Sequence, residues 1–175
     1  AVAHWLEAGE RAVERYAIPE AISQLNTGLR LLKELPESPE RIALELKYHI
    51  AIAMPIASAK GYTAPELVAT LERARALCQR LGNPPQIFPV LHGMGKFYQA
   101  QAEHGKVDSL GQELLDIARR ADDDALYIEA HRNLGMSYAL AGRYAESVLH
   151  CDAALARYVP ERHRAHTLIY AVDPA

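Results

Sequence analysis

A spacing of twelve residues between small or medium side chains constrains this sequence more than any other feature. The spacing joins Gly9 to Ala21, Gly95 to Val107, and Gly135 to Ser147. In each case a short break rich in Gly or Pro, or a polar turn, falls between the two positions. Two helices that cross closely need small side chains at the crossing, because bulk there would push the helix axes apart. The spacing therefore predicts repeated antiparallel helix hairpins.

The hydrophobic pattern predicts helices along nearly the whole chain. Apolar residues recur at intervals of three and four, no alternation with a period of two is present, and strong helix formers dominate. Pro, Gly or Asp clusters mark the breaks. The predicted helices run over 1–16, 19–35, 39–59, 64–81, 85–103, 106–121, 124–141 and 144–158, with a ninth starting at about 162. Short connections make consecutive helices antiparallel neighbours, so the expected fold is all-α.

Two helix starts show capping patterns. Ser38 stands directly before Pro39, where proline costs no hydrogen bond in the first helical turn. Thr63 and Glu66 have the spacing of a capping box, in which each side chain bonds a backbone N–H near the helix start. We expect Ser38 and Thr63 to cap the helices that follow them.

The repeated unit resembles the tetratricopeptide repeat. The resemblance rests on Trp5, Gly9, Ala21, Leu25, Gly28, Gly95, Tyr98, Gly135, Tyr138, Gly142, Tyr144 and Ala154. It implies a right-handed solenoid of about four hairpins in one domain over 1–175. The repeats would cover 1–37, 38–82, 83–121 and 122–160, and 161–175 would begin the next. The markers Gly9, Ala53, Gly95 and Gly135 lie further apart than the family period of about 34 residues, which leaves the superhelical pitch open.

Longer strings resemble one bacterial family. The strings are 3–12, 60–66, 76–82 and 163–166 with Asp173 and Pro174. They look like the helical region that follows a nucleotide-binding ATPase module in large signalling proteins. Many of those proteins carry a class III adenylate/guanylate cyclase domain, and others carry a DNA-binding output domain. The resemblance implies that this chain is a fragment containing neither cyclase nor ATPase.

Composition excludes several classes of protein. The formal net charge is −3 and the pI about 6.3, whereas a duplex nucleic-acid binder normally shows a basic excess. No apolar stretch approaches the ~18 residues of a membrane span. The two cysteines, Cys78 and Cys151, are far apart in helical patterns, which is typical of buried thiols in a reducing compartment. We expect a cytoplasmic protein.

Motifs for catalysis are absent from the sequence. No phosphate-binding loop, nucleophile elbow or His-Glu-x-x-His string is present, so we expect no enzyme activity and no cofactor. His163 and His166 form the closest candidate metal pair, but structural zinc needs four ligands. His92 and His104 are expected in solvent, and His131 between helices. The three tyrosines of the repeat, Tyr98, Tyr138 and Tyr144, are expected in packing positions.

The resemblance implies a concave groove lined by the first helix of each pair. Its expected lining in the third and fourth pairs is His92, Lys96, Gln99, Glu129, Arg132 and Met136; in the first two pairs it is Leu6, Glu10, Val13, Lys47, Ile50 and Met54. A mixed polar and apolar stripe suits a peptide or a partner helix. We expect a scaffold or sensor that binds a peptide, a partner protein or a neighbouring domain, with an unknown oligomeric state. The alternatives are a small-molecule-sensing domain of a transcriptional regulator and a metal-dependent hydrolase.

Overall fold

The computed structural model describes residues 2–163. Contacts between Cα atoms divide the chain into two compact units, Ala1–Phe97 and Tyr98–Ala175, and the division falls inside one helix.

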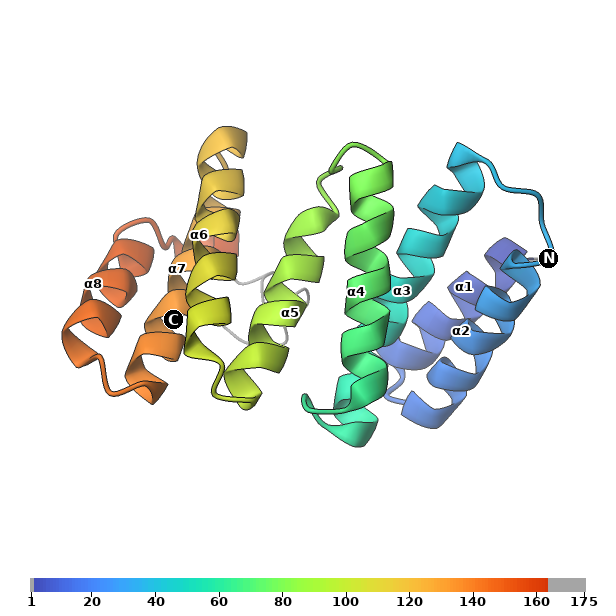
Figure 1. Ribbon diagram of the computed structural model, residues 1–175, viewed down its shortest axis with the longest axis horizontal. Helices are drawn as coiled ribbons and strands as arrows, with labels where there is room; N and C mark the ends of the chain where they lie inside the picture. Colours follow the sequence, from blue (N-terminus) through green and yellow to red (C-terminus); the bar gives the residue numbers. More distant parts are fainter. Residues whose placement is uncertain (1, 164–175) are drawn as a thin grey trace. The chain divides into compact units, whose positions relative to one another are not determined.

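All regular secondary structure in the described residues is helical, as the sequence predicts (Figure 1). The observed ends differ from the predicted ends by a few residues at most. The helices are α1 (Val2–Glu14), α2 (Ile18–Leu32), α3 (Pro39–Lys60), α4 (Pro65–Arg80), α5 (Ile87–Ala100), α6 (His104–Ala121), α7 (Asp124–Leu140), α8 (Tyr144–Leu155) and α9 (Pro160–His163).

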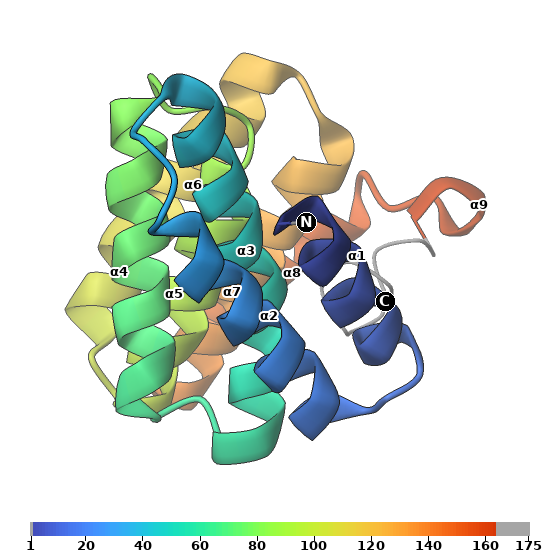
Figure 2. The same cartoon turned by 90° about the vertical axis from the view of Figure 1, so that its right-hand side faces the viewer.

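In the first unit α1 packs against α2, α2 against α3, and α3 against α4 (Figures 1 and 2). Glycines make two of these contacts possible. A Cβ atom on Gly9 would lie 2.5 Å from Cγ of Leu25, and one on Gly28 would lie 2.1 Å from Oη of Tyr48. The Tyr48 hydroxyl in turn donates a 2.6 Å hydrogen bond to the carbonyl oxygen of Val2. Gly9 and Gly28 thus let a larger side chain of a neighbouring helix occupy the space at each crossing.

In the second unit α7 packs against both α6 and α8. A Cβ atom on Gly111 would lie 2.2 Å from Cδ2 of Leu134, and one on Gly135 would lie 2.9 Å from Sγ of Cys151. At the same crossing, the Ser147 hydroxyl donates a 2.8 Å hydrogen bond to the carbonyl oxygen of Gly135. The two ends of one predicted twelve-residue spacing therefore meet directly.

One of the two capping predictions is confirmed and the other is wrong. The Ser38 hydroxyl accepts a hydrogen bond from the Arg41 backbone N–H at 3.2 Å, which confirms that cap. The Thr63 cap is wrong, because α4 begins after Ala64 and receives no side-chain cap. Glu66 instead pairs with Lys60 across the turn, at 2.6 Å.

The boundary between α6 and α7 shows why an acidic cluster stands there. Asp122 ends α6 in the left-handed conformation, with φ +50°. The Asp123 carboxylate then accepts hydrogen bonds from the backbone N–H groups of Ala125 and Leu126 at 2.8 and 3.2 Å. An acidic N-cap satisfies helix donors and complements the positive end of the helix dipole, so the cluster ends one helix and starts the next.

Helix α3 is the one described helix whose length and apolar composition would allow it to cross a membrane. About 39% of that stretch is buried in the structure. Its packing against α2 and α4, and the ion pairs described below, fit equally well a helix in the interior of a bundle.

Candidate functional site

A cavity of about 360 Å³ lies in the first unit, among α2, α3 and α4. Its apolar part is formed by Ile22, Leu29, Leu32, Ile52 and Ile56. Its polar part is formed by Asn26, Arg30, Lys33, Arg41, Glu45, His49, Lys60, Glu66 and Thr70. The α3 members recur every three or four residues, so they form one stripe along the helix.

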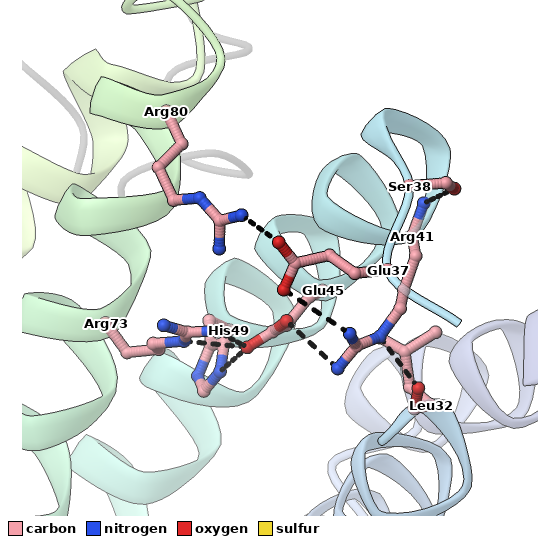
Figure 3. A network of polar contacts seen from close by, with 8 residues as sticks. All are labelled: Leu32, Glu37, Ser38, Arg41, Glu45, His49, Arg73 and Arg80. Atoms are coloured by element: carbon pink, nitrogen blue, oxygen red, sulfur yellow. Dashed lines mark hydrogen bonds and ion pairs between the residues drawn. The ribbon is translucent and has the colours of Figure 1, made fainter. Parts of the chain in front are cut away.

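A network of ion pairs and one hydrogen bond to a backbone carbonyl, centred on Glu45, joins the three helices beside the cavity (Figure 3). From α4, Nε and Nη2 of Arg73 each lie 2.7 Å from Oε1 of Glu45. From α3 itself, Nη2 of Arg41 lies 4.0 Å from Oε2. Glu45 is buried, and a buried carboxylate without such partners would be strongly destabilising. The network therefore holds the cavity walls together.

Arg41 connects the same network to α2. Its Nε atom donates a 2.9 Å hydrogen bond to the carbonyl oxygen of Leu32, the last residue of α2. Terminal carbonyls of a helix lack partners within the helix. In the loop before α3, Glu37 lies within ion-pair distance of Arg41 and pairs with Arg80 of α4 (Figure 3).

His49 lies one helical turn beyond Glu45 and also lines the cavity. Burial lowers its pKa, and the nearby cations Arg73 and Lys33 act in the same direction, against the raising effect of Glu45. This lowered pKa favours the neutral form of the ring. Its Nδ1 atom is buried and has no hydrogen-bond partner among the described residues.

The cavity is electropositive although the whole chain is acidic. Four Lys or Arg side chains line it against two carboxylates, whereas the chain carries a formal charge of −3. Both carboxylates are already paired, Glu45 with Arg73 and Glu66 with Lys60. Arg30 and Lys33 are exposed and take no ion pair among the described residues. The site thus offers an apolar floor with positive charge at its edge.

This cavity lies on the face of α3 opposite the predicted groove. Because residues advance about 100° around a helix, the stripe Glu45, His49 and Ile52 faces about half a turn away from Lys47, Ile50 and Met54. Lys47 and Met54 are exposed and Ile50 is partly exposed. The groove on that side stays a prediction.

The other predicted groove positions occupy varied environments. In the first pair Leu6 is buried, Val13 partly exposed and Glu10 exposed. His92 is only 5% exposed, so the expectation of a solvated ring is wrong; it sits in α5 among many other buried residues. Lys96 and Gln99 are partly exposed.

On α7 two predicted groove residues bind each other. The fully buried Glu129 accepts hydrogen bonds from Nε and Nη2 of Arg132, at 3.0 and 2.8 Å. Met136, one turn further, is half exposed. Of these three side chains, Met136 is the one most open to solvent.

Most of the repeat positions are buried. Buried positions are Gly9, Ala21, Leu25, Gly28, Gly95, Tyr138 and Ala154. Trp5 and Tyr98 are partly exposed, and Gly142 forms the α7–α8 turn with φ +74°. Tyr144 differs, since its side chain is 70% exposed. It is the first residue of α8, one turn before the crossing at Ser147.

Two histidines meet between α7 and α8, where the sequence predicts His131. The Nδ1 atoms of His131 and His150 lie 3.0 Å apart. The rings of Tyr127 and Tyr138 lie beside them, with centroids 4.3 Å from His131 and 5.2 Å from His150, respectively. Burial lowers the pKa of His131 to about 4, and His150 adds to this effect.

Metal ligands do not gather within residues 2–163, where no group of three or more His, Cys, Asp or Glu side chains has suitable geometry. His166 of the predicted metal pair lies outside the described residues. Cys78 is buried and burial raises its pKa, whereas Cys151 is exposed, so the expectation of two buried thiols holds for Cys78 only.

Sequence reasoning did not find the cavity. One signal was present, because Arg41, Glu45 and His49 follow one another at intervals of four and so share a helix face. The partner Arg73 belongs to another helix, and no spacing along the chain connects it to Glu45.

No family model matches this chain, and no curated protein matches its sequence.

Proposed function

We propose that this chain is a non-catalytic, tetratricopeptide-like interaction module of a bacterial signalling protein of the cyclase or ATPase type. In this proposal it binds a peptide segment of a partner protein or of a neighbouring domain. The observation that carries the proposal is the cavity among α2, α3 and α4. The proposal places the protein in the cytoplasm, and the two free thiols of the described residues are compatible with a reducing compartment.

The size and lining of the cavity favour a short anchor. A volume of about 360 Å³ falls at the lower end of the ~300–1,000 Å³ range of ligand sites. It can hold one or two side chains of a bound segment, with the remainder of the segment along the surface. An apolar floor with a polar edge is the usual composition of such an anchor pocket.

The rigidity of the walls favours the same function. The Glu45 network fixes α2, α3 and α4 through contacts from Arg41 and Arg73. A site whose geometry exists before binding loses less conformational entropy when the ligand arrives. The ion pairs therefore favour binding as well as folding.

A library of random twelve-residue peptides displayed on phage, selected on the full chain, tests this proposal. Asn26→Trp fills the cavity from an exposed position on α2 and should leave the fold intact. Ser23→Trp is the matched control, because Ser23 is exposed on the same helix and does not line the cavity. Selected peptides should bind the chain and the Ser23→Trp variant equally, and at least tenfold more weakly to Asn26→Trp. Equal binding to all three would contradict the proposal.

The cavity volume also favours a second candidate, a small-molecule sensor that belongs to a transcriptional regulator. A ligand that binds only the folded state raises the unfolding midpoint, by an amount that grows with the logarithm of its concentration relative to its dissociation constant. A thermal-shift screen with metabolites would identify such a ligand, and the rise should disappear in Asn26→Trp. A screen without any such rise would remove this candidate.

A further inference from the structure

We infer that the cavity among α2, α3 and α4 recognises a carboxylate carried on a short aliphatic group, with Arg30 and Lys33 binding the charge. This inference rests on the proposed function, because it names the chemistry of the ligand at the same site.

The charges around the cavity select an anion. The two carboxylates of the lining are occupied, since Glu66 lies 2.6 Å from Lys60 and Glu45 lies 2.7 Å from Arg73. Arg30 and Lys33 remain, exposed and without an ion pair among the described residues. Both also stand near the C-terminal end of α2, where cations stabilise the helix dipole. Binding of an anion by these two side chains must therefore be measured separately from their effect on stability.

The apolar floor requires that the anion carry hydrocarbon. Leu29 is partly exposed, while Ile52 and Ile56 are buried, and all three line the cavity. An inorganic anion would leave this surface in contact with water. An aliphatic group next to the carboxylate would cover it, and burying apolar surface is favourable.

His49 is a further polar residue of the cavity lining. Its buried Nδ1 atom has no hydrogen-bond partner among the described residues, although nearly all buried polar atoms in proteins have one. The neutral imidazole can donate or accept at this atom, depending on its tautomer.

Two kinds of ligand carry a carboxylate on a short aliphatic group. One is a free organic acid, and the other is the C-terminal residue of a peptide when its side chain is aliphatic. Two pairs of probes distinguish these sources. Hexanoate and hexanol share a tail and differ in charge, while the peptide Gly-Ser-Gly-Ser-Ile-Leu is compared with a free and with an amidated C-terminus.

The measurement is a titration of the ¹⁵N-labelled full chain with each probe, followed by amide chemical shifts. Hexanoate or the free-carboxylate peptide should change the chemical shifts of amides in α2, α3 and α4. Its dissociation constant should be at least tenfold lower than that of its uncharged counterpart. The double variant Arg30→Glu/Lys33→Glu should lose this binding at least tenfold. The control Arg11→Glu/Arg120→Glu has the same change in charge at exposed positions outside the cavity, and should retain it. A preference for hexanoate assigns a free acid, and a preference for the peptide assigns a protein terminus; either supports the inference.

Two results overturn the inference and have different consequences for the proposed function. If charged and uncharged probes bind equally, and Arg30→Glu/Lys33→Glu binds like the control, the inferred recognition of a carboxylate is wrong. The cavity then remains a docking site. If no probe shifts the cavity amides, and Asn26→Trp also leaves selected peptides bound, both the inference and the proposed function fail.

Discussion

The region around α3 in the first unit and the α7–α8 hairpin in the second both place a glycine at a helix crossing, but different side chains secure the two crossings. In both, a glycine lets a neighbouring helix approach closely, at Gly28 and at Gly135. Around α3, the neighbouring helices are then joined by charged side chains, through Glu45 and Arg73. Helices α7 and α8 are joined by aromatic rings instead. One repeat geometry can therefore be stabilised in ways that respond differently to substitution, pH and salt.

The largest effect should come from adding bulk at a glycine crossing. Gly135→Leu places a side chain against the backbone of Ser147 and Cys151, which cannot move aside without separating α7 from α8. We expect a loss of about 3 kcal/mol in the free energy of unfolding, the upper range for an overpacked core. Gly105→Leu is the control, because nothing lies within 4 Å of a Cβ atom there. Denaturant unfolding followed by circular dichroism measures both, and equal stabilities would show that the crossing is loose.

Removing the central carboxylate of the network should have the next largest effect. Glu45→Gln leaves Arg73 and Arg41 beside an uncharged group, and loss of one partner of a buried pair costs about 3 kcal/mol. Because the Arg73 side chain is 44% exposed, we expect a smaller loss of roughly 2 kcal/mol. Glu72→Gln, at an exposed position on α4, should change stability little. Amide hydrogen exchange should localise the difference to α2, α3 and α4; protection unchanged there would contradict the role of Glu45.

Acid should weaken the α7–α8 hairpin. The folded-state pKa of His131 is about 4, below its ordinary value of 6.5. The resulting stability is present above pH 6.5 and is lost as the pH falls from 6.5 through 4. We expect a loss on the order of 2 kcal/mol across this window. His131→Phe keeps a ring and removes the titration, so hydrogen exchange in α7 and α8 should depend less on pH in this variant. An identical pH dependence in both proteins would refute the assignment to His131.

The smallest effect belongs to the exposed ion pairs. Arg80→Gln removes a pair with Glu37 in which both side chains are largely exposed. Such pairs contribute about 0.5 kcal/mol and are screened by salt. The variant should therefore differ from the wild type at low ionic strength and match it at about 1 M salt. A difference that persists at high salt would mean that Arg80 contributes through packing.

The fold could be predicted from local sequence because each helix contains its own signals. Pro39, the turn at Gly142 and the Asp123 cap all stand at helix ends in the structure. The twelve-residue spacing also specified a contact in space, confirmed by the hydrogen bond from Ser147 to Gly135. Thr63 shows the limit of such signals, since a matching string does not cap when Glu66 pairs with Lys60 instead.

The site could not be predicted in the same way. A cavity depends on the space left among helices, and its charge depends on which carboxylates are already paired. Arg30 and Lys33 look like ordinary surface residues in the sequence, and become notable only because Glu45 is engaged by Arg73. Glu129 is a second example. Its full burial in the second unit and its pairing with the Arg132 guanidinium, three residues away, become visible only in the structure.

The most direct test is to measure stability and binding together in the cavity-filling variant Asn26→Trp. If the cavity is a binding site, this variant should unfold at the same denaturant concentration as the Ser23→Trp control and fail to bind the selected peptides. If the variant binds those peptides as well as the control does, the space among α2, α3 and α4 is only a packing defect and the account is contradicted.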